Sequence, residues 1–208
     1  MPKRDITITA ADGACPAGLF VPAGGSRRGV ILYMDAFGPR PALDGMAGRL
    51  EAAGHAVLVP DLFYRQGAYG PFDAKTAFTV EESAARIRAM MAATTQAMTQ
   101  ADTGPFLDAL AAEGVERVGV VGYCMGGARA LNAAAAHPDR IRAAASFHGG
   151  NLASDAEDSP HRSAAAIKAR VHVGVAGVDR SFPPEQSARL AQALREAEVD
   201  HTIENYVG

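Results

Sequence analysis

Short apolar segments alternate with longer alanine-rich segments along most of the chain. In residues 29–34 nearly every side chain is apolar, which is typical of a strand buried on both faces of a sheet. The alanine-rich segments repeat apolar residues at helical spacing. This alternation predicts an α/β fold, with a mainly parallel sheet and helices on both of its faces.

The pattern also predicts where the elements lie. Strands are expected at residues 6–9, 17–21, 29–34, 57–59, 117–121, 141–147, 171–175 and 201–207. Helices are expected at residues 43–53, 80–101, 106–112, 125–136 and 184–198. The turn signal Asp12-Gly13 makes the first two strands an antiparallel pair, and Gly104-Pro105 is expected to separate the two middle helices.

Two stretches are expected to be irregular, residues 61–77, which are rich in Gly, Tyr, Phe and Pro, and the polar residues 151–162. Long loops in compact domains often carry function. Neither an internal repeat nor a linker interrupts the alternation. Residues 1–208 are therefore expected to form a single α/β domain.

Composition narrows the class of protein. Hydrophobic residues make up 48% of the chain and charged residues 21%, as in ordinary soluble domains, and the net charge is −3. That balance gives no general attraction to nucleic acid or to an anionic membrane. No signal peptide or transmembrane run is recognisable, and Cys15 and Cys124 do not resemble a disulfide framework. A reduced, cytoplasmic protein without nucleic-acid or membrane partners is expected.

The chemistry is concentrated in residues 118–127, Val-Gly-Val-Val-Gly-Tyr-Cys-Met-Gly-Gly. A predicted strand, the pattern G-x-C-x-G and a predicted helix follow one another, which is the nucleophile-elbow arrangement with cysteine in place of serine. The helix N-terminus would stabilise a thiolate at Cys124, and the backbone N–H of Met125 is the first expected oxyanion donor. The alternatives are a buried cysteine in a tight turn and a glycine-rich phosphate loop.

These residues resemble the Gly-Tyr-Cys-x-Gly-Gly elbow of the dienelactone hydrolase (carboxymethylenebutenolidase) family of α/β-hydrolases. Three further segments fall where that family has similar ones: Tyr-Met-Asp-Ala-Phe-Gly at residues 33–38, Pro-Asp-Leu-Phe at residues 60–63 and Val-Ala-Gly-Val-Asp at residues 175–179. The resemblance runs in order along nearly the whole chain and implies an α/β-hydrolase fold.

The resemblance implies roles for particular residues. Cys124 would attack an ester or lactone carbonyl, and Asp179 would be the acid of the triad. Ala36 would give the second oxyanion N–H. Asp35 would hold the resting thiol neutral, where the family usually has the longer glutamate. Asp179 could instead be a helix cap or a surface ion-pair partner, and Asp35 could simply bond loop amides.

The family histidine lies in a His-Gly motif after the last strand. Here the strand expected at residues 201–207 is followed by Gly208, where the sequence given stops. We therefore expect this form to lack the histidine loop and the closing helix, to be impaired as a catalyst and to expose one sheet face as a monomer or homodimer. His148 follows a predicted strand at the edge where parallel sheets bind ligands, so it is expected to line the pocket and not to act as the base.

Small esters or lactones are the expected substrates, and neither a cofactor nor a metal site is predicted. In the family, arginines hold a carboxylate of the substrate. Arg86 is the expected equivalent, with Arg88 and Arg65 as alternatives, and Phe37 and Tyr123 are expected to line the pocket.

Two other functions compete with hydrolysis. A thiol-redox protein would need Cys15 as a resolving thiol, although Cys15 is far from the elbow in this fold. A non-catalytic binding or regulatory domain would need no histidine.

Overall fold

The computed structural model describes residues 3–207, and its centre is one eight-stranded sheet with the order β1-β2-β4-β3-β5-β6-β7-β8. The strands are β1 (Arg4–Ala10), β2 (Gly13–Phe20), β3 (Arg28–Tyr33), β4 (Ala56–Pro60), β5 (Arg117–Tyr123), β6 (Ile141–Phe147), β7 (Arg170–Ala176) and β8 (His201–Tyr206). Only the β1–β2 and β2–β4 pairs are antiparallel. The predicted mainly parallel α/β fold is confirmed.

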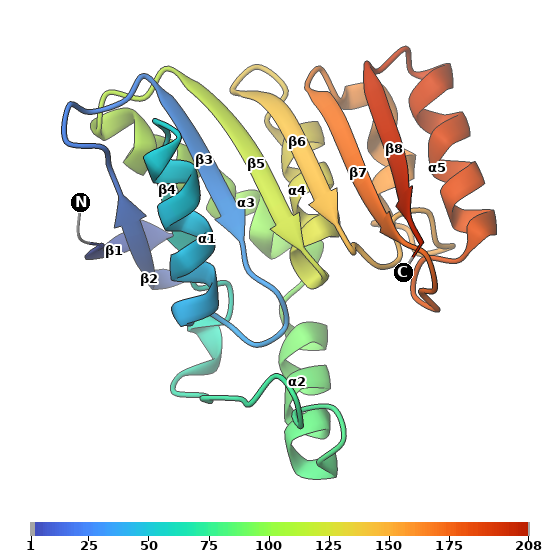
Figure 1. Cartoon of the computed structure of the whole chain (residues 1–208), viewed down its shortest axis with the longest axis horizontal. Coiled ribbons are helices and arrows are strands. Elements are labelled where there is room, and N and C mark those ends of the chain that lie inside the picture. Colours follow the sequence, from blue (N-terminus) through green and yellow to red (C-terminus); the bar gives the residue numbers. More distant parts are fainter. Residues whose placement is uncertain (1–2, 208) are drawn as a thin grey trace.

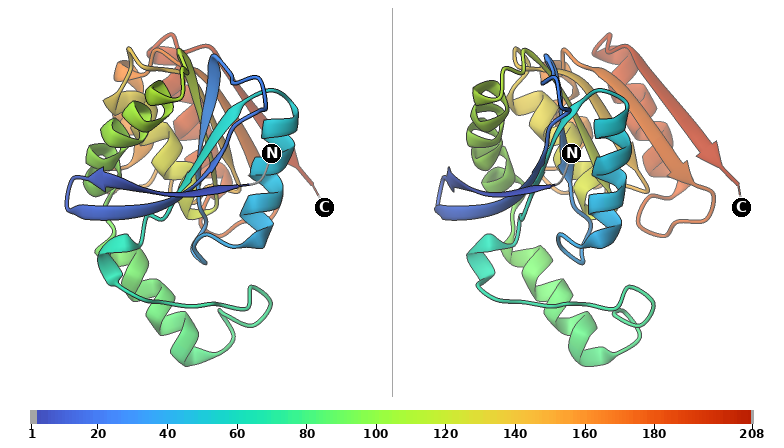
Figure 2. Two further views of the ribbon diagram at one scale, coloured as in Figure 1. Left: turned by 90° about the vertical axis from the view of Figure 1, so that its left-hand side faces the viewer. Right: turned by 60° about the vertical axis from the view of Figure 1, so that its left-hand side comes forward.

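Five α-helices and two 3₁₀ helices lie between the described strands. They are α1 (Pro41–Ala52), α2 (Glu81–Ala93), α3 (Gln96–Ala112), α4 (Met125–Ala136), α5 (Pro184–Glu196), η1 (Tyr64–Gln66) and η2 (Pro160–Ala166). Helix α1 lies on one side of the sheet and α3 and α4 lie on the other (Figure 2). Helix α2 extends past the carboxyl ends of the strands (Figure 1). None of the helices in residues 3–207 combines the length and apolar character needed to cross a bilayer.

The predicted break between the middle helices is wrong. The structure places it at Thr94–Thr95, and Pro105 lies inside α3. The hydroxyl oxygen of Thr95 accepts a hydrogen bond from the backbone N–H of Met98 at 3.2 Å, so Thr95 caps α3. This cap starts the helix well before the proline. In addition, the stretch expected to be a polar loop at residues 151–162 runs into η2 at Pro160.

The irregular segment after β4 is anchored by a buried ion pair. Asp102 of α3 is 1% exposed, and both its oxygens accept hydrogen bonds from the Arg65 guanidinium, at 2.7 and 3.0 Å. Tyr64 also donates to Asp102, and Arg65 pairs with Asp12 in the β1–β2 turn. The segment that leads toward α2 is therefore fixed to both α3 and the first hairpin.

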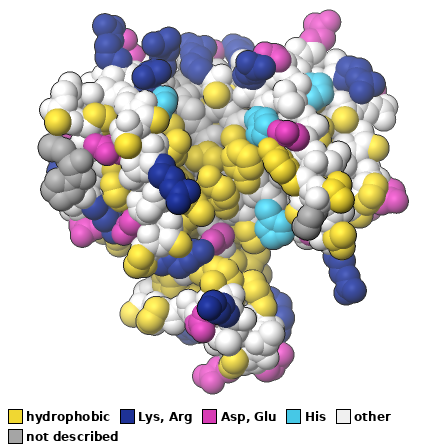
Figure 3. Space-filling model, viewed as in Figure 1, with side chains coloured by type: hydrophobic (Ala, Val, Ile, Leu, Met, Phe, Trp, Pro, Cys, Tyr) yellow, Lys and Arg dark blue, Asp and Glu magenta, His cyan; other side chains and the backbone are white. Residues whose placement is uncertain are grey.

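The side of the sheet on which α1 lies, opposite α3 and α4, carries apolar side chains at its surface. In Figure 3, hydrophobic side chains gather over the central strands, beside α1. Tyr123, Phe147 and His172 form a row of rings across β5, β6 and β7, with centroid separations of 5.6 and 5.4 Å, and all three are only half-buried. Half-buried apolar surface is thus present on one face of the sheet.

Candidate active site

The turn between β5 and α4 holds Cys124 in a strained conformation. Its φ is 53° and its ψ is −118°, in a region that side-chain-bearing residues seldom adopt. A Cβ on Gly122 would lie 1.9 Å from the Gly126 carbonyl oxygen, and a Cβ on Gly126 would lie 2.5 Å from the Tyr33 carbonyl oxygen. Only glycine fits at these two positions, which explains the G-x-C-x-G pattern.

The thiol of Cys124 is partly buried and lies among backbone donors. Burial is the main cause that raises its pKa, and the nearby carboxylates of Asp35 and Asp179 raise it further. Hydrogen bonds from the backbone N–H groups of Met125 and Ala36 lower the pKa but do not outweigh burial. The resting group is therefore a neutral thiol at neutral pH, and it needs a proton acceptor before it can attack a carbonyl.

Asp35 is engaged by a neighbouring arginine. Arg40 donates from Nη1 and Nη2 to the two carboxylate oxygens, each at 2.7 Å, and the Phe37 backbone N–H donates to one of them at 3.0 Å. A bidentate pair of this kind restrains the carboxylate. Asp35 acts on the thiol through its charge while its oxygens are held by Arg40 and Phe37.

Asp179 and His148 lie together at the carboxyl edge of the sheet. The Asp179 side chain is 8% exposed, and one oxygen accepts from the Ser181 backbone N–H and hydroxyl at 2.8 and 2.6 Å. The other oxygen lies 3.6 Å from Nε2 of His148, whose side chain is 61% exposed. Like Cys124, His148 has a φ of 53°.

The register places His148 next to the nucleophile turn. Tyr123 of β5 pairs with Phe147 of β6, and the Cys124 backbone N–H donates to the Phe147 carbonyl at 3.0 Å. Cys124 and His148 therefore leave adjacent strands at the same level, and such strands are about 4.8 Å apart. Cys124, His148 and Asp179 follow three neighbouring strands in order.

A cavity of about 370 Å³ opens beside Cys124. Its walls come from the start of α4, from the α2–α3 junction and from the loops after β6 and β7. The lining includes Met91, Gln96, Cys124, Met125, Arg129, Asn151, Asp158 and Ser181. Backbone and side-chain polar groups therefore face this space together with the thiol.

None of the four side chains predicted to line the pocket belongs to the lining of this cavity. His148 lies at the carboxyl ends of the strands beside Asp179, as described above. Tyr123 points to the sheet face, where it stacks on Phe147. Arg86 is exposed on α2 and donates to the Ala68 carbonyl at 3.2 Å. Phe37 lies against Phe78 and lines a different cavity. Both alternative arginines form ion pairs with acidic side chains, Arg88 with Glu81 and Arg65 with Asp102. A linear sequence does not show which way such side chains point, so their part in binding substrate stays a prediction.

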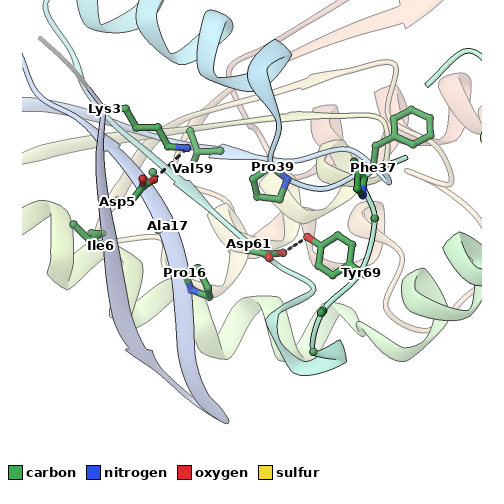
Figure 4. Close-up of a pocket in the computed structure, with 15 residues that line it drawn as sticks. Lys3, Asp5, Ile6, Pro16, Ala17, Phe37, Pro39, Val59, Asp61 and Tyr69 are labelled. Carbon is green, nitrogen blue, oxygen red and sulfur yellow. Dashed lines mark hydrogen bonds and ion pairs between the residues drawn. The ribbon is translucent and has the colours of Figure 1, made fainter. Parts of the chain in front are cut away.

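That second cavity, of about 410 Å³, lies between the N-terminal strands and residues 67–71 (Figure 4). Asp61 and Tyr69 meet in its wall, where the tyrosine hydroxyl donates to the carboxylate. Burial raises the pKa of Asp61, and the bond from Tyr69 opposes this effect. In the part of the chain that the structure describes, no three His, Cys, Asp or Glu side chains gather as a metal site would require.

The comparison with family models decides the family. The dienelactone hydrolase family model matches residues 16–208. This chain belongs to the dienelactone hydrolase family. The β5–α4 elbow and the strand order described above are thus those of a member of that family.

Relatives of known name and structure agree with that membership. A Rhodococcus opacus protein named carboxymethylenebutenolidase is 34% identical over 131 residues, which is 57% of this chain and 43% of that protein. A curated relative from Methylorubrum extorquens is 26% identical over 93% of this chain and 66% of its own. The chain therefore spans about two thirds of the length of one of these relatives and under half of the other.

A solved structure supports the dienelactone hydrolase fold directly. A dienelactone hydrolase-like promiscuous phosphotriesterase from metagenomic libraries is 27% identical with a TM-score of 0.74, covering 100% of this chain and 82% of that one. The dienelactone hydrolase of Anabaena variabilis has a TM-score of 0.68 at 19% identity, with 99% and 86% coverage, and shows the fold alone.

The structure adds two groups that the sequence reasoning did not bring to the site. Arg129 lines the cavity beside Cys124, although an arginine on a predicted helix usually points to solvent. The pairing of His148 with Asp179 was also not predicted, even though both residues were singled out. The signal that could have suggested it is their position at the carboxyl ends of strands that pair in a parallel sheet.

Proposed function

We propose that this chain hydrolyses small esters or lactones through an acyl-enzyme on Cys124. The observation that carries the proposal is the strained turn that holds Cys124 beside an open cavity. Hydrogen bonds from the backbone N–H groups of Met125 and Ala36 lower the pKa of its thiol. Two such donors near the reacting atom are what an acyl-transfer site needs to stabilise an oxyanion. Membership of the dienelactone hydrolase family supports the same reaction class.

In the first half-reaction, sulfur forms a bond to the carbonyl carbon, and the thiol proton passes to a base. The oxyanion that develops on the carbonyl oxygen accepts hydrogen bonds from Met125 and Ala36. When this intermediate collapses, the carbon–oxygen bond to the alcohol breaks and the alcohol takes the proton. Water then attacks the thioester, the acid leaves, and the thiol is restored.

For the base we propose His148, oriented by Asp179. Nε2 of His148 lies 3.6 Å from a carboxylate oxygen of Asp179. The register of β5 and β6 ends both strands at the same level, which places Cys124 and His148 side by side. Both observations support this assignment. A carboxylate beside an imidazole favours the protonated ring that forms when the thiol ionises. Asp35, held by Arg40, would keep the thiol protonated until substrate enters.

The test is steady-state hydrolysis of 4-nitrophenyl acetate by the full 208-residue chain and two cysteine variants. Cys124→Ala should lose at least about 10³ of the wild-type kcat/KM, because it removes the nucleophile. The matched control is Cys15→Ala, whose thiol is buried, has a pKa raised by burial to about 12 and should not react. Equal activity of Cys124→Ala and wild type would contradict the proposal and favour a binding role for the fold.

A further inference from the structure

The cavity between the N-terminal strands and residues 67–71 is separate from the cavity beside Cys124. Its volume of about 410 Å³ is in the range of small-molecule sites, and the two cavities share no lining residue among those that the structure describes. Apolar side chains form much of its wall, among them Ile6, Pro16, Pro39 and Val59. The proposed hydrolysis makes no use of this space.

Asp61 brings a partly buried charge to this wall. Figure 4 shows its carboxylate between Pro16 and Tyr69. Oδ1 accepts hydrogen bonds from the Tyr69 hydroxyl at 2.5 Å and from the Phe63 backbone N–H at 2.9 Å. A hydroxyl bond this short is typical of an ionised acceptor. Burial and the bond to Asp61 raise the pKa of Tyr69, so the tyrosine keeps its proton and remains the donor.

The Asp61 carboxylate has no cation beside it. Its Oδ2 has no hydrogen-bond partner among residues 3–207 and is the oxygen left to bind a ligand. Lys3 is the cation in the described wall, but its Nζ lies 3.2 Å from Asp5 and 3.3 Å from Asp44. Arg65 of the same segment is held in the ion pair with α3. A partly buried carboxylate without a counter-ion is costly, and a cationic ligand would remove that cost.

Other classes of ligand fit this wall less well. An anionic ligand would meet the charge of Asp61 and would find Lys3 already shared by two carboxylates. A metal ion needs several ligands, and no three His, Cys, Asp or Glu side chains gather as a metal site within residues 3–207. An organic ammonium needs one carboxylate for its charge and apolar surface for its body. The ring of Tyr69, next to Asp61, adds a face that attracts cations.

We propose that this cavity binds a small organic cation, an ammonium group on an apolar body, with Asp61 as its counter-ion. The ammonium donates to Oδ2, while Oδ1 keeps its bonds from Tyr69 and Phe63. The apolar body lies against the prolines of the wall. Because the site shares no described lining residue with the cavity beside Cys124, the inference is independent of the proposed function.

Three ligands with the same ring and different charges test this proposal: 2-phenylethylamine, 2-phenylethanol and phenylacetate. Isothermal titration calorimetry of the full chain should give the amine a Kd of about 1 mM or lower, at least about tenfold tighter than the alcohol or the acid. Asp61→Asn should weaken binding of the amine about tenfold or more and binding of the alcohol less than about twofold. This variant removes the charge but keeps an oxygen that accepts from Tyr69.

Two further variants remove a carboxylate from other positions. Asp73→Asn is the matched control, because Asp73 is exposed in the same segment and does not line the cavity; it should leave the affinity for the amine within about twofold. Asp5 lines the cavity, but its side chain is 85% exposed and pairs with Lys3. Asp5→Asn should therefore weaken the amine less than Asp61→Asn does. Circular dichroism checks that each variant is folded.

A measurement on wild type needs no variant. In nuclear magnetic resonance spectra, the amine should shift the amide signals of residues 67–71 and leave that of Met125 unchanged. The proposal is overturned if the amine binds no tighter than the alcohol, or if it shifts Met125 and not residues 67–71. It is also overturned if folded Asp61→Asn keeps the wild-type affinity, or if Asp5→Asn loses as much affinity as Asp61→Asn.

Discussion

At the scale of single residues, the site is organised around a thiol that is not activated at rest. Burial and the charges of Asp35 and Asp179 raise the pKa of Cys124, while two backbone N–H groups lower it. The same two N–H groups would donate hydrogen bonds to an oxyanion. They would therefore stabilise the transition state more than the resting thiol, because negative charge has by then moved from sulfur to the substrate oxygen. Proton transfer to His148 is then the step on which the proposed reaction depends.

Replacing His148 tests that step. We expect His148→Gln to lower kcat/KM by about 10²–10⁴, the usual contribution of a general base. The melting temperature of the protein should not change, because the His148 side chain is exposed. Because the folded thiol has a raised pKa, the remaining activity should increase with pH through pH 9 as more thiolate forms. The measurement is a pH profile of kcat/KM.

The matched control for that experiment is His201→Gln, at the amino end of β8 and thus at the opposite edge of the sheet. It should behave as wild type. If His148→Gln keeps the wild-type kcat/KM and pH profile, another group accepts the proton of Cys124 and the His148 assignment is wrong.

Individual residues also show where sequence reasoning stops. The nucleophile, the acid and the first oxyanion donor were inferred from the elbow motif and from the family resemblance, and they remain assignments to be tested. The Arg40 pair of Asp35 and the burial of Arg129 depend on side-chain directions and on the packing of α4 against the α2–α3 junction. No local pattern encodes such contacts.

At the scale of elements, the β5–α4 turn depends on glycines that have no room for a side chain. Gly122→Ala would put its Cβ against the Gly126 carbonyl and should destabilise the fold by about 3 kcal/mol or more. Gly45→Ala in α1 meets no atom within 4 Å and should stabilise by roughly 0.5–1 kcal/mol. Urea unfolding followed by circular dichroism measures both variants. Equal stability of Gly122→Ala and wild type would contradict the close approach at the elbow.

Most strands were predicted within a few residues, because apolar runs and turn signals are local features. The α2–α3 break was misplaced because Gly104-Pro105 is a stronger sequence signal than the Thr95 cap that the structure uses. Tertiary packing of α3 against α4 and β1 stabilises the helix around Pro105. Local propensity was overridden there by contacts distant in sequence.

At the scale of the whole molecule, strand order is what brings the proposed catalytic residues together. Cys124, His148 and Asp179 follow β5, β6 and β7, which are neighbours in the sheet, and all three lie at its carboxyl edge. The periodic pattern predicted a parallel sheet and the family resemblance predicted its fold. The side-chain pairing at that edge required the structure. The apolar row on the sheet face is a second feature of the whole molecule, separate from the cavity beside Cys124.

The most direct measurement is intact-mass spectrometry of the chain quenched in acid during turnover of 4-nitrophenyl acetate, followed by peptide mapping. The account predicts a mass increase of one acetyl group, located on Cys124 and lost in Cys124→Ala. An absence of any adduct during turnover, or an acetyl group on another residue that persists in Cys124→Ala, would contradict acyl-enzyme chemistry at this cysteine.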